Sequence, residues 1–217
     1  MVSKHYNVIV IGGGAAGFFS ALNIGEVNTA YKILILEKTS KLLTKVKVSG
    51  GGRCNVTHHC FEAKKLSGHY PRGAKALNDL FKTFQAKDTV QWFEKHGVVL
   101  KTEADGRMFP TTDNSQTIIN CFLKEAERLR IQVEVNKRVV AVQRGDHEFT
   151  VLCESGDRFT CKKIVVATGG HASPDAYQWL AKTGHTIVTP IPSLFTFNDS
   201  EKDFKDLMGL SVPRAEV

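Results

Sequence analysis

Short apolar runs alternate with a segment of helical character at the start of the chain. Residues 6–11 (Tyr-Asn-Val-Ile-Val-Ile) have the β-branched character of a buried strand, and residues 33–36 (Ile-Leu-Ile-Leu) form a second apolar run. Residues 18–27, which lie between these two runs, are expected to form a helix. Strand, helix and strand in this order are typical of a βαβ unit, so we expect an α/β fold with a parallel sheet.

Helical spacing returns in the middle of the chain. Residues 74–84 place four apolar side chains at helical intervals, and residues 89–94 continue the pattern with further aromatic residues. Residues 115–129 predict an amphipathic helix that leads into residues 131–135, the expected third parallel strand. Aromatic residues at such spacing more often belong to a core than to a ring-stacking site, and we assign them to the core.

Several short strands follow. Residues 138–142, 147–153 and 158–161 are expected to be strands, the last two joined by a turn at residues 155–157. Residues 164–167 (Ile-Val-Val-Ala) predict a buried strand that breaks at Thr-Gly-Gly, at the carboxyl edge of the sheet where doubly wound folds bind ligands. We therefore expect a β-meander inserted between the third and fourth parallel strands, which is not the plain arrangement of an NAD-dependent dehydrogenase.

The first strand runs directly into a Gly-x-Gly-x-x-Gly pattern. In this pattern Gly12 permits the tight turn, Gly14 leaves room for a pyrophosphate, and Gly17 lets the following helix pack close to the sheet. The N–H groups at the start of that helix would face the phosphates. Glu37 follows the second strand, where its carboxylate can accept hydrogen bonds from a ribose diol. The pattern predicts a site for an adenine dinucleotide; the alternative is a glycine-rich turn in some other α/β domain.

A second glycine-rich stretch covers residues 47–57 (Lys-Val-Ser-Gly-Gly-Gly-Arg-Cys-Asn-Val-Thr). Three consecutive glycines can wrap closely around a ligand, and their N–H groups can form an anion-binding nest. Arg53 adds a cation, and Asn55 and Thr57 add hydrogen-bonding groups. The alternative is a flexible surface loop, but the polar residues directly after the glycines favour a ligand-binding loop.

Composition narrows the functional classes. The 217 residues are 42% hydrophobic, which is enough for a core in one or two domains, and no apolar run approaches the roughly 18 residues of a membrane span. Five cysteines without a Cys-x-x-Cys motif, and the lack of a signal peptide, favour reduced thiols in the cytoplasm. The net charge is +7, but the basic residues are spread along the chain and mixed with acidic residues, so we expect no nucleic-acid partner. We expect no metal site either, because the adjacent residues 58–60 (His-His-Cys) cannot all face one ion.

Four stretches occur in one order along the chain: residues 12–17, residues 49–55 (Ser-Gly-Gly-Gly-Arg-Cys-Asn), residues 106–110 (Gly-Arg-Met-Phe-Pro) and residues 167–170 (Ala-Thr-Gly-Gly). Together they resemble the FAD-dependent oxidoreductases of the aminoacetone oxidase and BaiN-like type, a branch of the two-dinucleotide-binding-domain flavoproteins. The second stretch is the most specific. The resemblance implies a Rossmann-like FAD-binding domain with a parallel sheet and a β-meander.

The resemblance also implies roles for individual residues. The glycine turn would cradle the FAD pyrophosphate, Glu37 and Lys38 would lie at the adenosine ribose, and Val139 would meet the adenine through its backbone. Residues 50–55 would line the ribityl and isoalloxazine side, and residues 167–169 would close over the cofactor. The expected cofactor-binding residues are Gly12, Gly13, Gly14, Ala15, Ala16, Gly17, Glu37, Lys38, Gly50, Gly51, Gly52, Arg53, Cys54, Asn55, Val139, Ala167, Thr168 and Gly169. No catalytic residue is identified.

The chain departs from this family in two places. Residues 171–179 (His-Ala-Ser-Pro-Asp-Ala-Tyr-Gln-Trp) stand where the family usually carries a Gly-Ser-Thr-Gly-like stretch. Family members are also much longer, with a substrate domain after the Thr-Gly-Gly strand. Residues 190–192 (Pro-Ile-Pro) predict an exit linker. We therefore expect an FAD-binding domain at residues 1–189, and a linker with the start of a substrate domain, truncated before it is complete, at residues 190–217.

The expected function is that of an oxidoreductase that passes hydride through the flavin N5. It would act on a small-molecule substrate, and electrons would come from the substrate itself or from NAD(P)H at the flavin, because no second Gly-x-Gly-x-x-Gly is present. The alternative is a non-catalytic or truncated dinucleotide-binding module that binds FAD weakly or not at all. An NAD-dependent dehydrogenase is disfavoured by the triple-glycine loop. Substrate identity and oligomeric state stay open.

Overall fold

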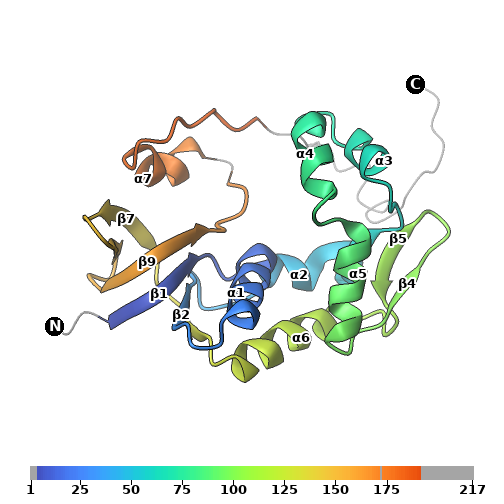
Figure 1. Cartoon of the computed structure of the whole chain (residues 1–217), viewed down its shortest axis with the longest axis horizontal. Coiled ribbons are helices and arrows are strands. Elements are labelled where there is room, and N and C mark those ends of the chain that lie inside the picture. The colour runs from blue at the N-terminus through green and yellow to red at the C-terminus, as the bar shows by residue number, and fades with distance from the viewer. Residues whose placement is uncertain (1–3, 172, 192–217) are drawn as a thin grey trace, which may run out of the picture.

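The computed structural model describes residues 4–171 and 173–191. Its main sheet has six strands in the order β6-β2-β1-β9-β8-β7, and a small sheet has the order β3-β5-β4. Figure 1 shows the two sheets toward opposite ends of the molecule, with helices between them. The strands are β1 (Lys4–Ile11), β2 (Ile33–Leu36), β3 (Thr57–His58), β4 (Leu100–Thr102), β5 (Arg107–Pro110), β6 (Gln132–Glu134), β7 (Val139–Arg144), β8 (Phe149–Cys153) and β9 (Arg158–Val166).

The predicted helices are present with small shifts at their ends. The helical elements are α1 (Ala15–Val27), α2 (Thr44–Val48), α3 (Ala63–Gly68), α4 (Ala74–Phe81), α5 (Ala86–Lys95), α6 (Ser115–Arg128) and α7 (Gln178–Ala181), with the 3-10 turns η1 (Ser49–Gly52) and η2 (Pro174–Tyr177). The Asn114 side chain caps α6 by accepting a hydrogen bond from the backbone N–H of Gln116. In the described part of the chain, no helix has the length and hydropathy needed to cross a bilayer.

The parallel half of the sheet is confirmed. Strand β1 pairs in parallel with β2 on one side and with β9 on the other, and β2 pairs in parallel with β6. The register places Ile11 opposite both Leu36 and Val166, so these three strands end at the same level. Because β1 and β2 are covered on both faces, they need the continuous apolar runs seen in the sequence.

The β-meander is present, but one detail of its prediction is wrong. The expected strands at residues 158–161 and 164–167 are a single strand, β9, whose exposed Lys162 and Lys163 interrupt the apolar pattern without ending the strand. Strand β9 pairs antiparallel with β8 through its first half and in parallel with β1 along most of its length. The meander is therefore an extension of the main sheet, joined to the parallel half through a shared strand.

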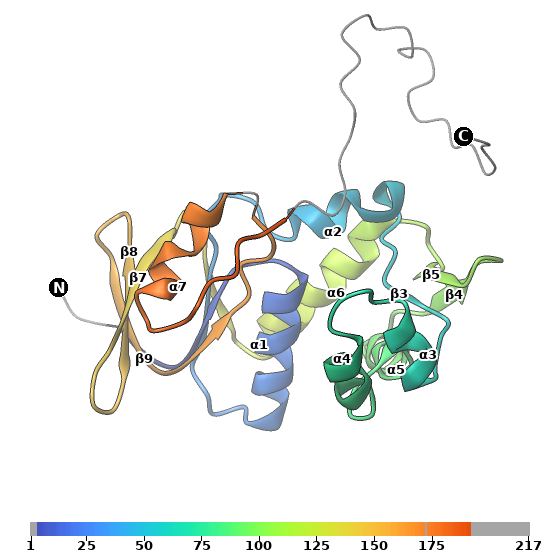
Figure 2. The same cartoon turned by 90° about the horizontal axis from the view of Figure 1, so that it is seen from above.

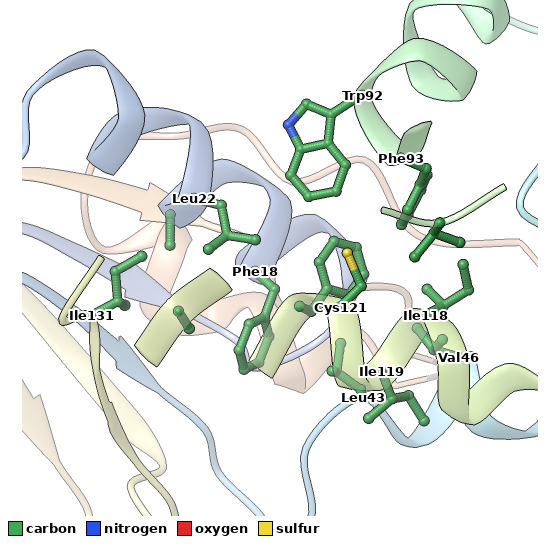
Figure 3. Packing of buried hydrophobic residues seen from close by; sticks show 14 of the residues in the cluster. Phe18, Leu22, Leu43, Val46, Trp92, Phe93, Ile118, Ile119, Cys121 and Ile131 are labelled. Atoms are coloured by element: carbon green, nitrogen blue, oxygen red, sulfur yellow. The ribbon is translucent and has the colours of Figure 1, made fainter. Parts of the chain in front are cut away.

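Two apolar clusters cover the two faces of the sheet. One face of β1 and β2 packs against α1, α5 and α6, and Figure 3 shows Phe18 and Leu22 of α1 beside Phe93 and Ile118 from the other two helices. The opposite face packs against side chains of β8 and β9, including Val151. Figure 2 shows α1 and the β7–β8 hairpin on different sides of β1. The helices therefore cover one face of the parallel strands, and side chains of β8 and β9 pack on the other.

Candidate functional site

The candidate site lies at the carboxyl edge of the parallel strands. The backbone N–H of Gly12 donates to the carbonyl of Leu36 at 2.8 Å, and the N–H of Ala167 donates to the carbonyl of Ile11 at 2.8 Å. These bonds bring the turn after β1, the end of β2 and the loop after β9 together. Three segments that are far apart in the sequence therefore meet at the edge where open α/β sheets bind their ligands.

Two glycines of the turn after β1 are required by close approach of the backbone. Gly12 has a φ of +117°, and a Cβ atom on it would lie 2.3 Å from the carbonyl oxygen of Ala167. A Cβ atom on Gly17 would lie 1.9 Å from the carbonyl oxygen of Gly12. Gly17 thus allows the first turn of α1 to fold back onto the glycine turn itself, a closer contact than the predicted one between helix and sheet.

The N-terminus of α1 is built to receive an anion. Gly14 is the N-cap residue and no side chain caps the helix, so the backbone N–H groups of the first turn have no side-chain acceptor. A Cβ atom on Gly14 would meet nothing within 4 Å. The space beside this residue is therefore open, as expected for a residue whose backbone a pyrophosphate approaches. Ala15 and Ala16 are exposed at the same helix end, and Gly13 is buried beneath it.

A cavity of about 320 Å³ lies next to this turn. Six of the expected cofactor-binding residues line it, and they come from all three converging segments and from β7: Gly12, Glu37, Lys38, Val139, Thr168 and Gly169. The other members of the glycine turn, Ala167 and the whole of residues 50–55 lie outside its lining. The cavity therefore brings together the three residues expected at the adenosine half (Glu37, Lys38 and Val139) with Gly12, Thr168 and Gly169, and includes none of those expected at the flavin half.

The carboxylate of Glu37 holds the glycine turn as well as facing the cavity. Its Oε2 accepts a hydrogen bond from the N–H of Gly13 at 2.8 Å. Its Oε1 accepts from the N–H and the hydroxyl of Thr39, at 2.8 Å and 2.9 Å. An ionised carboxylate offers about four acceptor positions, so these three bonds leave capacity for a ribose hydroxyl.

The triple-glycine loop adopts a left-handed backbone. Gly50, Gly51 and Gly52 have φ values of +55°, +67° and +86°, and Cys54 continues the pattern at +65°. A Cβ atom on Gly50 would lie 2.7 Å from the backbone nitrogen of Asn55, whereas Gly51 and Gly52 have no neighbour within 4 Å of such an atom. The first glycine is required by the fold, and the next two expose open backbone.

Arg53 is held by protein side chains on one side of this loop. Its guanidinium pairs with Glu103, lies 3.6 Å from an oxygen of Asp113 and stacks 4.0 Å from the ring centre of Phe109. The hydrogen bond to Glu103 raises the pKa of Arg53. The sequence predicted a cation here but not these partners, which lie about fifty positions away along the chain and leave no local signal.

Cys54 is a packed thiol. It is buried in the larger apolar cluster, and burial raises its pKa above the ordinary value, so the neutral thiol is favoured. The cysteine therefore has the packing expected of a small core residue and lacks the depressed pKa of a reactive thiolate.

Residues 58–60 do not converge on one point, because His59 is exposed and the His58 ring bonds the carbonyl of Asp105 at 3.0 Å. In the residues that the structure describes, three ligand-type side chains gather elsewhere, at Glu26, His96 and Glu125.

The grouping of Glu26, His96 and Glu125 is an ion-pair network. Lys95 lies 3.2 Å from one carboxylate oxygen of Glu26, and Arg128 lies 3.1 Å from the other. His96 bonds Glu26 at 2.8 Å through Nε2 and the carbonyl of Trp92 at 2.6 Å through Nδ1. The carboxylates already face three cationic or ionisable side chains, so the cluster joins α1, α5 and α6 through ion pairs.

The chain segment after the Thr-Gly-Gly loop also lines the cavity, which sequence reasoning missed. Residues 171–179, the departure from the family pattern, include η2 and lead into α7. The cavity residues from this part of the chain are His171, Asp175, Ala176, Tyr177, Gln178, Trp179 and Lys182. A serine followed by proline and an acid signals a helical start at residues 173–175, and this signal could have located the turn.

Comparison with known proteins supports a family assignment. The chain is 25% identical over 207 residues to a 3-dehydro-bile acid delta(4,6)-reductase of Clostridium scindens, covering 93% of this chain and 49% of that protein. It is 27% identical over 219 residues to a ribosomal RNA dihydrouridine synthase of Escherichia coli K12, covering 97% and 53% respectively. The chain thus spans about half the length of the curated relatives it matches.

Solved structures with a similar fold include a dehydrogenase and a reductase. A 3-ketosteroid-delta4-(5alpha)-dehydrogenase from Rhodococcus jostii RHA1 matches with a TM-score of 0.59 at 16% identity, covering 79% of this chain and 47% of that chain. The open conformation of a flavocytochrome c3 fumarate reductase matches with a TM-score of 0.57 at 22% identity, covering 78% and 34%. At these identities the likeness concerns the fold alone.

The sequence profile of the HI0933-like protein Rossmann domain matches residues 6–197. This range includes the glycine turn, the triple-glycine loop and every residue that lines the cavity. The match agrees with the family resemblance drawn from the sequence. The chain belongs to the HI0933-like Rossmann-domain family.

Proposed function

We propose that this chain forms the FAD-binding domain of a flavin-dependent oxidoreductase. The observation that carries the proposal is the pairing of two features at one sheet edge. The uncapped N-terminus of α1 opens beside Gly14, and the cavity lined by Glu37 and Val139 lies next to it. The first suits a pyrophosphate, and the second suits the nucleoside attached to it.

In this proposal, the residues of the glycine turn bind and orient the cofactor. The N–H groups of the first turn of α1 would donate to the pyrophosphate, and Glu37 would accept from the adenosine ribose with its remaining capacity. Lys38 and the backbone of Val139 line the same cavity and would complete the adenosine half.

The triple-glycine loop would serve the other half of the cofactor. Gly51 and Gly52 present open backbone, and Arg53 is held beside them by Glu103 and Phe109. When bound, FAD supplies the isoalloxazine N5 that carries hydride. The loop would hold the ribityl and ring portion by backbone N–H groups, as a nest of left-handed residues does for anionic and polar ligands.

The reaction of the whole protein is proposed from its relatives. A delta(4,6)-reductase and a dihydrouridine synthase are both named for reductions. We place the reduction of a substrate double bond first, with a small molecule as the substrate that accepts the electrons and NAD(P)H as their source. In the reverse direction, oxidation of the substrate by the flavin, the substrate itself would supply the electrons. The alternative is a dinucleotide-binding module without turnover. The free cysteines suit a reducing compartment such as the cytoplasm.

The test is cofactor binding by the purified 217-residue protein. We expect titration with FAD and with ADP to give saturable binding, and FMN to bind more weakly because it lacks the adenosine half of the recognised group. Mass spectrometry of any co-purified cofactor checks its identity, and bleaching of the flavin absorbance by a candidate reductant separates an enzyme from a binding module. Absence of FAD binding, or a clear preference for NAD, would overturn the proposal.

A further inference from the structure

The residues that follow the Thr-Gly-Gly loop form one wall of the cavity. The Ser173 hydroxyl caps η2 by accepting a hydrogen bond from the N–H of Asp175 at 3.2 Å, and Pro174 opens the turn. The chain then continues into α7. Seven residues between 171 and 182 line the cavity together with Gly12, Glu37 and Val139.

The hydroxyl of Tyr177 fastens this wall to the loop after β9. It accepts a hydrogen bond from the backbone N–H of His171 at 2.7 Å and donates to the carbonyl of Gly169 at 3.3 Å. From the other side, Lys45 of α2 donates to the carbonyl of Gly170 at 3.4 Å. Three consecutive residues of the loop are thus each held by a side chain from another element.

The base of the wall rests on the meander. Trp179 of α7 packs against the apolar cluster on the far face of the sheet, as Val139 and Ile164 also do. Figure 1 shows α7 above β7 and β9, and Figure 2 shows it beside β7. Because β7 begins at Val139, the same strand supports the wall and supplies the opposite side of the cavity.

We infer that residue 171 and residues 173–182 form the outer wall of an adenosine subsite, and that Tyr177 is its positioning residue. This inference rests on the proposed function. The cavity volume of about 320 Å³ falls at the lower end of the roughly 300–1,000 Å³ typical of small-molecule sites, so it suits one nucleoside. The adenine would lie against Val139 and the side chains of the wall, with the ribose at Glu37.

The variant Tyr177→Phe tests this assignment, because it keeps the ring and removes only the hydroxyl. We expect the dissociation constants for FAD and for ADP to rise by the same factor, about three- to tenfold, the range of one hydrogen bond. Tyr31→Phe is the matched control, since Tyr31 is exposed before β2, away from the carboxyl edge, and its variant should bind both ligands as the wild type does. ADP binding to the wild type should also slow amide hydrogen exchange in residues 171–182.

Each outcome has a distinct meaning. If FAD binding weakens but ADP binding is unchanged, the wall faces the flavin half and the inference is overturned. Equal affinities of Tyr177→Phe and the wild type for both ligands, with no protection of residues 171–182, also overturn it and leave the proposed function standing. If the wild type binds neither FAD nor ADP, the proposed function fails and this inference fails with it.

Discussion

The carboxylate of Glu37 binds the N–H of Gly13 and both donors of Thr39, so it stabilises the glycine turn before any ligand arrives. Its position after β2 was predicted from the sequence, because strand length and the spacing to the glycines set it. The hydrogen bonds from Gly13 and Thr39 could not be predicted from the sequence, because they depend on how the Glu37 side chain folds back over the glycine turn.

We predict that Glu37→Ala weakens FAD binding by about 1.5–3 kcal/mol, the scale of hydrogen bonds to a charged group. The variant should also melt at a lower temperature without ligand, because Gly13 and Thr39 lose their acceptor. Fluorescence titration and thermal melting measure the two effects. Glu127→Ala, on the exposed face of α6, is the control and should change neither. Unchanged FAD affinity in Glu37→Ala would show that the ribose assignment is wrong.

A second prediction compares two substitutions in the glycine turn, one of which should affect FAD binding and the other stability. Gly14→Val places a branched side chain in open space, so the protein should fold and lose FAD, because the side chain occupies the pyrophosphate position. Gly17→Ala should instead lose stability, because its Cβ would lie 1.9 Å from the carbonyl oxygen of Gly12. Circular dichroism and cofactor absorbance separate the two cases. A folded, fully loaded Gly14→Val protein contradicts the dinucleotide assignment.

At the scale of elements, helices α1, α5 and α6 are joined by the network around Glu26. Burial alone would raise the pKa of Glu26, but hydrogen bonds from His96 and Lys95 outweigh burial and hold the pKa below its ordinary value of 4.5. A folded pKa below the unfolded one means that the stabilisation is complete above the unfolded value. It is lost as the pH falls through the folded pKa.

We predict that Glu26→Gln lowers the free energy of unfolding by about 1–3 kcal/mol near pH 7, because two partly buried ion pairs lose their charge. The difference from the wild type should shrink as the pH falls below the ordinary value of 4.5 and through the lowered pKa of Glu26, because the carboxylate of the wild type then takes up a proton. Urea denaturation at the two pH values measures it, with Glu127→Gln as control. If Glu26→Gln lowers the free energy of unfolding by the same amount at both pH values, this account of the network is wrong.

The elements that the sequence predicted well are those whose pattern is complete within a few residues. The apolar runs of β1 and β2 and the spacing of α6 belong to this group. The sequence predicted two strands in place of β9, because the exposed Lys162 and Lys163 interrupt its apolar pattern. Only pairing with β1 and β8, which is long-range, shows that the strand continues.

Prediction of the candidate site from the sequence has the same limit, because long-range contacts leave no local pattern. The glycines and Glu37 could be identified from spacing, whereas the wall at residues 171 and 173–182 and the partners of Arg53 arise from segments that meet only in the folded chain. The expected division at residue 190 stays a prediction, because residues 192–217 lie outside the described residues.

At the scale of the whole molecule, the cavity encloses space for one nucleoside, and the triple-glycine loop lies outside it. We predict that the isoalloxazine of FAD bound to this chain remains open to water. Its fluorescence should be quenched by iodide almost as strongly as that of free FAD, and ADP should compete with FAD at a similar concentration. A bound flavin that is shielded from iodide, with FAD far tighter than ADP, would contradict this prediction.

Strand β9 also restricts the positions at which related chains can carry insertions and deletions. Its first half pairs with both β8 and β1, and its second half pairs with β1. One inserted or deleted residue would therefore turn every following side chain to the other face and shift Thr168 out of the crevice. The hairpin tips at residues 145–148 and 154–157 carry no such double constraint. Related chains should therefore vary in length at these tips, while the distance from Arg158 to Gly169 stays constant.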